Sequence, residues 1–239
     1  MSGTTHEPPV SLRNATVGAL IVSVTLGFAS DLLFVAALQF RPDWFADPAL
    51  LVAGGSGSAE LLKWAAQADL FSYYLPTIVV ATTLWAVFRG RNPILAFAAM
   101  LGALGYVLAG SIGAASLAMA GPQLIREYAQ PGTDQAAIAA AFGLLIDIVF
   151  RAIWQLVDGV FIAIWVIGVG FLVRPEQPAF ARLSWMLGGL FLLGAAMNAV
   201  GFGLGRDGIL GVVFLAWFAW DIWLAALLWR RRPPFDTLA

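Results

Sequence analysis

Six long apolar segments constrain the fold of this chain more than any other feature. A helix needs about 20 apolar residues to cross the hydrocarbon core of a membrane. The segments that reach or approach this length are Val17–Phe40, Leu70–Phe88, Ile94–Ala120, Ala136–Val173, Leu183–Leu204 and Ile209–Trp229. The chain is 61% hydrophobic and 11% charged, which is too little charge to cover a soluble surface. The sequence therefore predicts an all-α membrane bundle of six transmembrane helices.

The domain organisation follows from these segments. We expect an N-terminal tail over residues 1–16, one six-helix domain over 17–229 and a basic C-terminal tail over 230–239. A long outer loop is predicted over 41–69, and its Gly/Ser run favours a flexible connector. Within it, AELLKWAAQAD is a candidate helical extension of the second segment. The fourth segment is too long for one span, so either its first dozen residues project beyond the membrane or it breaks near Gly143.

The basic residues predict the orientation of the chain. With the N-terminus in the cytoplasm, the outer side holds Arg41, Lys63, Arg126 and Arg206. The cytoplasmic side holds Arg13, Arg89, Arg91, Arg174, Arg182, Arg230, Arg231 and Arg232. Eight basic residues inside against four outside agree with the positive-inside rule. We therefore expect a multi-pass protein of the cell membrane with both termini in the cytoplasm.

Composition and motifs argue against most kinds of catalytic site. There is no cysteine, the single histidine is His6 in the N-terminal tail, and the net charge of −1 gives no field for nucleic acid. The run GLGRDG, residues 203–208, has a nucleotide-loop spelling, but it lies between two apolar helices and predicts a tight turn. No cofactor or metal site is predicted, and the partners expected are lipid and not nucleic acid.

Small residues form two stripes at helical spacing. Gly105, Ala109 and Gly113 recur every four residues in the third segment. In the fifth segment, Gly194, Asn198, Gly201 and Gly205 fall on one helical face. Small residues let membrane helices approach closely, and an asparagine can hydrogen-bond across the contact. The stripes indicate helix packing, within one chain or with a second copy or a protein partner.

The fourth segment carries polar residues on one face. At 100° per residue, Asp147, Arg151, Gln155 and Asp158 fall within a wedge of about 100°, which we expect to face the bundle interior. Asp147 and Arg151 are four residues apart, the spacing of a helical ion pair. Asp158 has no cation within its own turn.

Two further acids lie in other apolar segments, Asp31 in the first and Asp221 in the sixth. From the helical rise, Asp31 lies about 15 Å from the outer end of its helix, Asp221 about 13 Å from the inner end, and Asp158 near the middle. A charge at the bilayer centre costs about 2.5–3.5 kcal/mol, so these acids must be neutral, hydrated or bonded to donors. One reading makes Asp31, Asp158 and Asp221 a proton or cation path. The other makes each a hydrogen-bond anchor. Asp31 then bonds a Ser, Trp or Asn of another helix, Asp158 bonds Gln155 or an indole, and Asp221 accepts from an indole of the sixth segment. Asn198 is a further supporting polar residue.

The layout resembles a bacterial family of six-helix membrane proteins filed as domain of unknown function 4386. The features that carry the resemblance are a retained first helix, a long first outer loop, an Arg-rich turn FRGRNP (88–93) and a last helix ending in LLWRRR (227–232). The resemblance covers nearly the whole chain and rests on layout. It implies a bacterial inner-membrane protein and no particular reaction.

Three functions are consistent with these observations; the sequence favours the first and ranks the third last. The first is an accessory, packing or small-ligand-binding membrane module without a catalytic site. The second is a small proton-coupled transporter or channel that uses Asp31, Asp158 and Asp221. The third is an intramembrane enzyme that acts on lipid through Asp/Arg pairs. If the three acids share one cavity, the second is favoured, and if each is capped by its own donor at a separate helix contact, the first is favoured.

Overall fold

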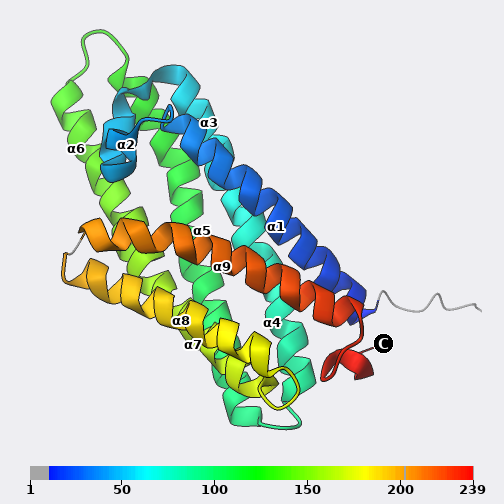
Figure 1. The fold of residues 1–239 in the computed structure, drawn as a ribbon. Helices are drawn as coiled ribbons and strands as arrows, with labels where there is room; N and C mark the ends of the chain where they lie inside the picture. The colour runs from blue at the N-terminus through cyan, green and yellow to red at the C-terminus, as the bar shows by residue number, and fades with distance from the viewer. Residues whose placement is uncertain (1–10, 202, 239) are drawn as a thin grey trace, which may run out of the picture.

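The computed structural model describes residues 11–201 and 203–238, and they form a bundle of helices (Figure 1). Six stretches are long and apolar enough to cross a membrane: Leu12–Ala37, Pro48–Phe88, Pro93–Tyr128, Gln135–Val173, Pro178–Ala199 and Gly211–Trp229. The part of the chain that the structure describes contains no strand. The prediction of an all-α bundle with six membrane-spanning helices is confirmed. Large apolar side chains such as Phe28, Leu108 and Leu215 face outward, where they contact lipid.

The second span is much longer than the sequence pattern predicts. Two short helical elements, α2 (Pro42–Ala46) and η1 (Pro48–Gly54), lead into α3 (Gly55–Asp69), a π-helical turn η2 (Leu70–Tyr74) and α4 (Leu75–Phe88). The prediction of a flexible Gly/Ser connector is therefore wrong, whereas the expected extension AELLKWAAQAD is helical. Leu62 and Ala66 are fully buried on α3, which packs between α1 (Leu12–Ala37) and α5 (Pro93–Tyr128). Burial of this apolar face stabilises a helix that its Gly/Ser start alone would not favour.

The fourth span runs without a break through Gly143. It consists of α6 (Gln135–Ile146), a π-helical segment η3 (Asp147–Val157) and α7 (Asp158–Val173). The fifth, α8 (Pro178–Ala199), ends earlier than predicted, and α9 (Gly203–Trp229) begins directly at GLGRDG. That run is helical, so the predicted tight turn is wrong. The turn lies just before it, where Gly201 has a φ of 76°.

The helices pack so that the start of α1 lies beside the end of α9. In Figure 1, α9 crosses the bundle and its last turn lies beside the first turn of α1. The C-terminal tail folds back as a short helical turn, η4 (Phe235–Thr237). Phe235 is fully buried against Phe88 at 6.2 Å between ring centroids, and the Gln177 side chain donates to the Pro233 carbonyl at 2.8 Å. The basic tail is thus packed against the bundle over its described part.

Tryptophans occupy both the core and the rim. Trp165, Trp217 and Trp220 form one buried cluster with ring centroids 5.5–5.8 Å apart. The Trp220 indole donates to Ser184 at 2.8 Å and the Trp217 indole nitrogen has no partner, so neither is the indole donor that the sequence predicts for Asp221. Near helix ends, four cations stack on indoles: Arg41 on Trp44, Lys63 on Trp64, Arg89 on Trp85 and Arg174 on Trp185. Such pairs suit the two membrane interfaces.

The first small-residue stripe packs within the chain. A Cβ at Gly105 would meet the Phe161 ring, and one at Gly113 would meet Trp154. Ala109, between them, is partly buried. These residues let α5 approach η3 and α7 closely.

The second stripe is not one helical face. Gly194 lies in α8, but that helix ends at Ala199, before Gly201. The surroundings of the Gly205 side-chain position lie outside the described residues. Association with a second copy or a partner through either stripe stays a prediction.

We predict that Gly102→Ala destabilises the bundle. A Cβ at Gly102 would lie 2.8 Å from the Phe161 carbonyl oxygen and from the Trp165 backbone nitrogen, and neither can move aside. Overpacking of this kind costs about 1–3 kcal/mol, so the melting temperature in detergent should fall. Gly189→Ala is the matched control, since its Cβ would meet nothing within 4 Å. Equal melting temperatures for the two variants would contradict this packing.

Candidate functional site

Asp158 lies in the interior of the bundle and accepts one hydrogen bond from a tyrosine. It is the first residue of α7 and is 4% exposed. The Tyr74 hydroxyl donates to its Oδ2 at 3.3 Å, while its Oδ1 has no partner in the structure. Tyr74 comes from the π-helical turn of the second span, so the bond joins two spans. A Cβ at Gly110 would lie 1.9 Å from the Tyr74 ring and 2.6 Å from the carboxyl. Only glycine leaves room for this contact.

Asp31 is bonded by the neighbouring tyrosine. The Tyr73 hydroxyl donates to its Oδ2 at 3.1 Å, and Asp31 is partly buried on α1. The Tyr73 ring lies against Gly27 of α1 and stacks with Phe218 of α9. Consecutive tyrosines of one π-helical turn therefore bond carboxyls on two different spans, α1 and α7.

Asp69 completes this group, although the sequence pattern assigns it to the end of an outer loop. It is the last residue of α3 and is 8% exposed. Its carboxyl lies near the Tyr74 hydroxyl, which bonds Asp158. Its spacing from Tyr73 and Tyr74 in the sequence identifies Asp69 as a member of the group. Once AELLKWAAQAD is helical, Asp69 lies about one turn from both tyrosines.

Asp221 is held by a different donor on a different contact. The Ser23 hydroxyl of α1 donates to its Oδ2 at 2.7 Å, and Asp221 is 2% exposed on α9. Asp221 lies within electrostatic range of Tyr73 and Tyr106. Tyr106 is itself buried, with its ring 4.9 Å from that of Tyr74. Each of the three acids predicted from sequence thus has its own hydroxyl donor at a separate helix contact, and none bonds another directly, which is the arrangement expected of hydrogen-bond anchors.

The ion pair predicted between Asp147 and Arg151 is present at 3.2 Å. Its side chains are about half exposed, so the prediction that this part of the polar face looks into the bundle is wrong. The cause is the π-helical segment from Asp147 to Val157, in which each turn holds about one residue more than in an α-helix. The polar side chains therefore do not stay on the single face that a regular α-helix would give them. Asp158, at the end of that segment, is turned inward and away from the pair.

The two supporting polar residues have separate positions. The Asn198 side chain donates to the Arg151 carbonyl at 2.7 Å, which ties α8 to the π-helical segment. The Gln155 Oε1 is buried without a partner, and Gln155 does not bond Asp158. Neither side chain makes a hydrogen bond to Tyr73, Tyr74 or their carboxyl partners.

We call Asp31, Asp69, Tyr73, Tyr74 and Asp158 the acid–tyrosine cluster. Among the residues whose side chains the structure describes (11–44, 46–201, 211–236 and 238), five ion pairs occur, and none includes a carboxyl of the cluster or Asp221. Within the same ranges, no group of three or more histidine, aspartate or glutamate side chains is arranged to hold a metal ion. The cluster therefore consists of tyrosine hydroxyl donors and carboxyls, which are groups that can exchange protons.

No family model, curated protein or solved structure matches this chain. The resemblance to the six-helix bacterial family rests on layout and stays a prediction.

We predict that the Ser23–Asp221 hydrogen bond stabilises the packing of α1 on α9. Ser23→Ala leaves a buried carboxyl oxygen without its donor, which costs about 1–3 kcal/mol. In a double-mutant cycle with Asp221→Asn, the coupling energy should be about 0.5–2 kcal/mol, as for other hydrogen bonds between membrane helices. Unfolding in mixed micelles measures both values.

Thr25→Ala is the control for this cycle. The Thr25 hydroxyl is exposed on the same helix and bonds only the carbonyls of Ile21 and Val22. A coupling energy near zero between Ser23 and Asp221, or an equal loss in the control, would contradict the assignment.

Proposed function

We propose that this protein conducts protons across a membrane through the acid–tyrosine cluster, either as a channel or as the proton path of a coupled transporter. One observation carries the proposal. Tyr73 and Tyr74 are consecutive residues of a π-helical turn, they bond the carboxyls of Asp31 and Asp158 on two spans, and Asp69 lies beside them.

The chemistry of these groups suits a relay. A tyrosine hydroxyl donates one proton and accepts another, so it can pass a proton between two carboxyls without becoming charged. As one carboxyl gives its proton to the hydroxyl oxygen, the hydroxyl releases its own proton to the next carboxylate. Asp31 is the most exposed acid of the cluster and Asp158 the most buried. In the proposed relay, a proton enters at Asp31 and passes to Asp158 by way of Tyr73, Asp69 and Tyr74.

The π-helical segments add support from the backbone. One contains both tyrosines and the other ends directly before Asp158. Segments of this kind interrupt the regular hydrogen-bond ladder and occur often at functional sites. An interior built only for packing has no need for four carboxyls with no cation beside them, because each one adds a desolvation cost.

The second candidate function is an accessory or packing module, and one observation favours it. Asp31, Asp158 and Asp221 each have a hydroxyl donor at a separate helix contact, as expected for hydrogen-bond anchors. The third function has no such support, since the exposed Asp147–Arg151 pair and the buried Asp158 do not form one site. We do not propose a lipid-acting enzyme.

We further propose that both termini face the cytoplasm of a bacterial cell. The first turn of α1 and the last turn of α9 lie side by side, which supports placing them on the same side of the membrane. Arg13, Arg230, Arg231 and Arg232 gather there, and the positive-inside rule makes that side cytoplasmic.

Proton flux into liposomes tests the proposal. Purified protein is reconstituted with a trapped pH dye, and a potassium gradient with valinomycin supplies the driving potential. We expect wild-type flux well above that of empty liposomes. Asp158→Asn and Tyr74→Phe should each reduce it to the empty-liposome level, because each removes a group through which the proton passes. Asp147→Asn is the control, since it removes an acid of the same span outside the cluster and should leave the flux unchanged.

Two results would contradict the proton path. One is a wild-type flux equal to that of empty liposomes. The other is an unchanged flux in Asp158→Asn and Tyr74→Phe. Either result, with folded protein in all samples, would leave the acids as hydrogen-bond anchors and favour the accessory module.

A further inference from the structure

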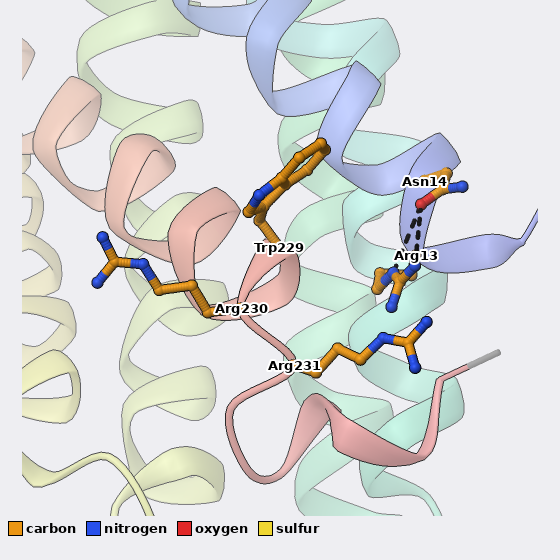
Figure 2. A pocket seen from close by; sticks show the side chains of 5 residues that line it. All are labelled: Arg13, Asn14, Trp229, Arg230 and Arg231. Atoms are coloured by element: carbon orange, nitrogen blue, oxygen red, sulfur yellow. Dashed lines mark hydrogen bonds between the residues drawn. The ribbon is translucent and has the colours of Figure 1, made fainter.

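A basic hollow lies where the start of α1 meets the end of α9. It is far along α1 from the acid–tyrosine cluster. It has a volume of about 480 Å³ and is lined by Arg13, Asn14, Trp229, Arg230 and Arg231. Figure 2 shows Arg231 reaching from the C-terminal segment toward Arg13 on α1, with the Trp229 ring above them and Arg230 directed to the other side. Two segments more than 200 residues apart in sequence thus bring two guanidinium groups to one hollow.

The charges of this hollow are not neutralised by the described residues. None of the five ion pairs between described residues includes Arg13, Arg230 or Arg231. The Arg13 Nη1 is buried without a hydrogen-bond partner, and its Nε and Nη2 make only long contacts, 3.4 Å, with the Asn14 side chain. A buried guanidinium nitrogen without an acceptor is costly, and an anionic oxygen in the hollow would satisfy it.

The position of the hollow indicates what kind of anion it receives. It lies at the ends of two membrane-spanning helices, where lipid headgroups are found. The Trp229 ring is 73% exposed there, as expected for an indole at the membrane interface. A guanidinium binds two phosphate oxygens at once through its planar fork.

We propose that this hollow binds the headgroup of an anionic phospholipid, with the phosphate between Arg13 and Arg231 and the upper acyl chain along Trp229. Arg230 adds positive charge at the rim. The site is independent of the proton path, because it shares no residue with the cluster.

Native mass spectrometry of the delipidated protein in a neutral detergent tests this site. Phosphatidylglycerol, phosphatidylcholine and inorganic phosphate are titrated separately, and bound adducts are counted. The wild type should bind the first phosphatidylglycerol more tightly than phosphatidylcholine. In the double variant Arg13→Gln/Arg231→Gln, this preference should fall on the order of twentyfold. Each arginine removed near an anionic lipid contributes about fivefold to that loss.

The matched control is Arg182→Gln/Arg232→Gln. It removes the same charge from exposed residues at the same end of the bundle, outside the hollow. It should keep the wild-type preference, and Arg13→Lys/Arg231→Lys should recover part of it, because lysine restores charge without the fork.

Three results would overturn the site. The first is equal binding of the two lipids by the wild type. The second is an equal loss of preference in the hollow and control variants, which would show nonspecific attraction to the basic side. The third is saturable binding of inorganic phosphate that displaces phosphatidylglycerol, which would show a site for free anions. If Arg13→Gln/Arg231→Gln does not fold, failure of Arg13→Lys/Arg231→Lys to recover any preference contradicts the proposal.

Discussion

The interior of this bundle depends on the hydrogen bonds that two consecutive tyrosines make to carboxyls on two other helices. In lipid, a carboxyl without a cation must take its stabilisation from donors inside the protein. Tyr73 and Tyr74 supply those donors to Asp31 and Asp158, so α1, the second span and α7 are joined through polar contacts. The second span is the centre of the arrangement, because α3 packs on both α1 and α5.

Glycines and π-helical turns make this geometry possible. Gly27 and Gly110 leave room for the two tyrosine rings, since a Cβ at either position would meet a ring atom within 3.1 Å. The π-helical turn over Leu70–Tyr74 sets the directions of both side chains, and the longer one before Asp158 turns that carboxyl inward. The buried tryptophan cluster packs beside the polar centre through Trp217 and Tyr106, and helix ends carry stacked Arg–Trp pairs. The apolar helices therefore enclose one polar centre and end in cationic rims.

The sequence allows part of this structure to be predicted. Hydropathy over about 20 residues identifies six spans because the bilayer requires that length, and the i, i+4 spacing identifies the Asp147–Arg151 pair. The helix from Gly55 could not be predicted, because Gly and Ser favour loops unless tertiary packing buries the face that contains Leu62 and Ala66. For the same reason, the sequence pattern leaves Asp69 in an outer loop and does not place it in the interior. The partners of the three predicted acids depend on which spans are neighbours and on how the π-helical turns redirect side chains. A projection at 100° per residue treats each helix as regular and isolated, so it predicts neither.

The most direct test of the central claim is whether the two tyrosines act in one path. Proton flux would be measured in liposomes for Tyr73→Phe, Tyr74→Phe and the double variant, each with its fold verified. In the proposed path, Asp31 and Asp158 are the two ends, and the proton passes through both hydroxyls and Asp69. We therefore expect each single variant to lose as much flux as the double variant, because interrupting one path twice removes nothing more. Independent effects that multiply in the double variant, or a double variant with wild-type flux, would contradict a single proton path through the cluster.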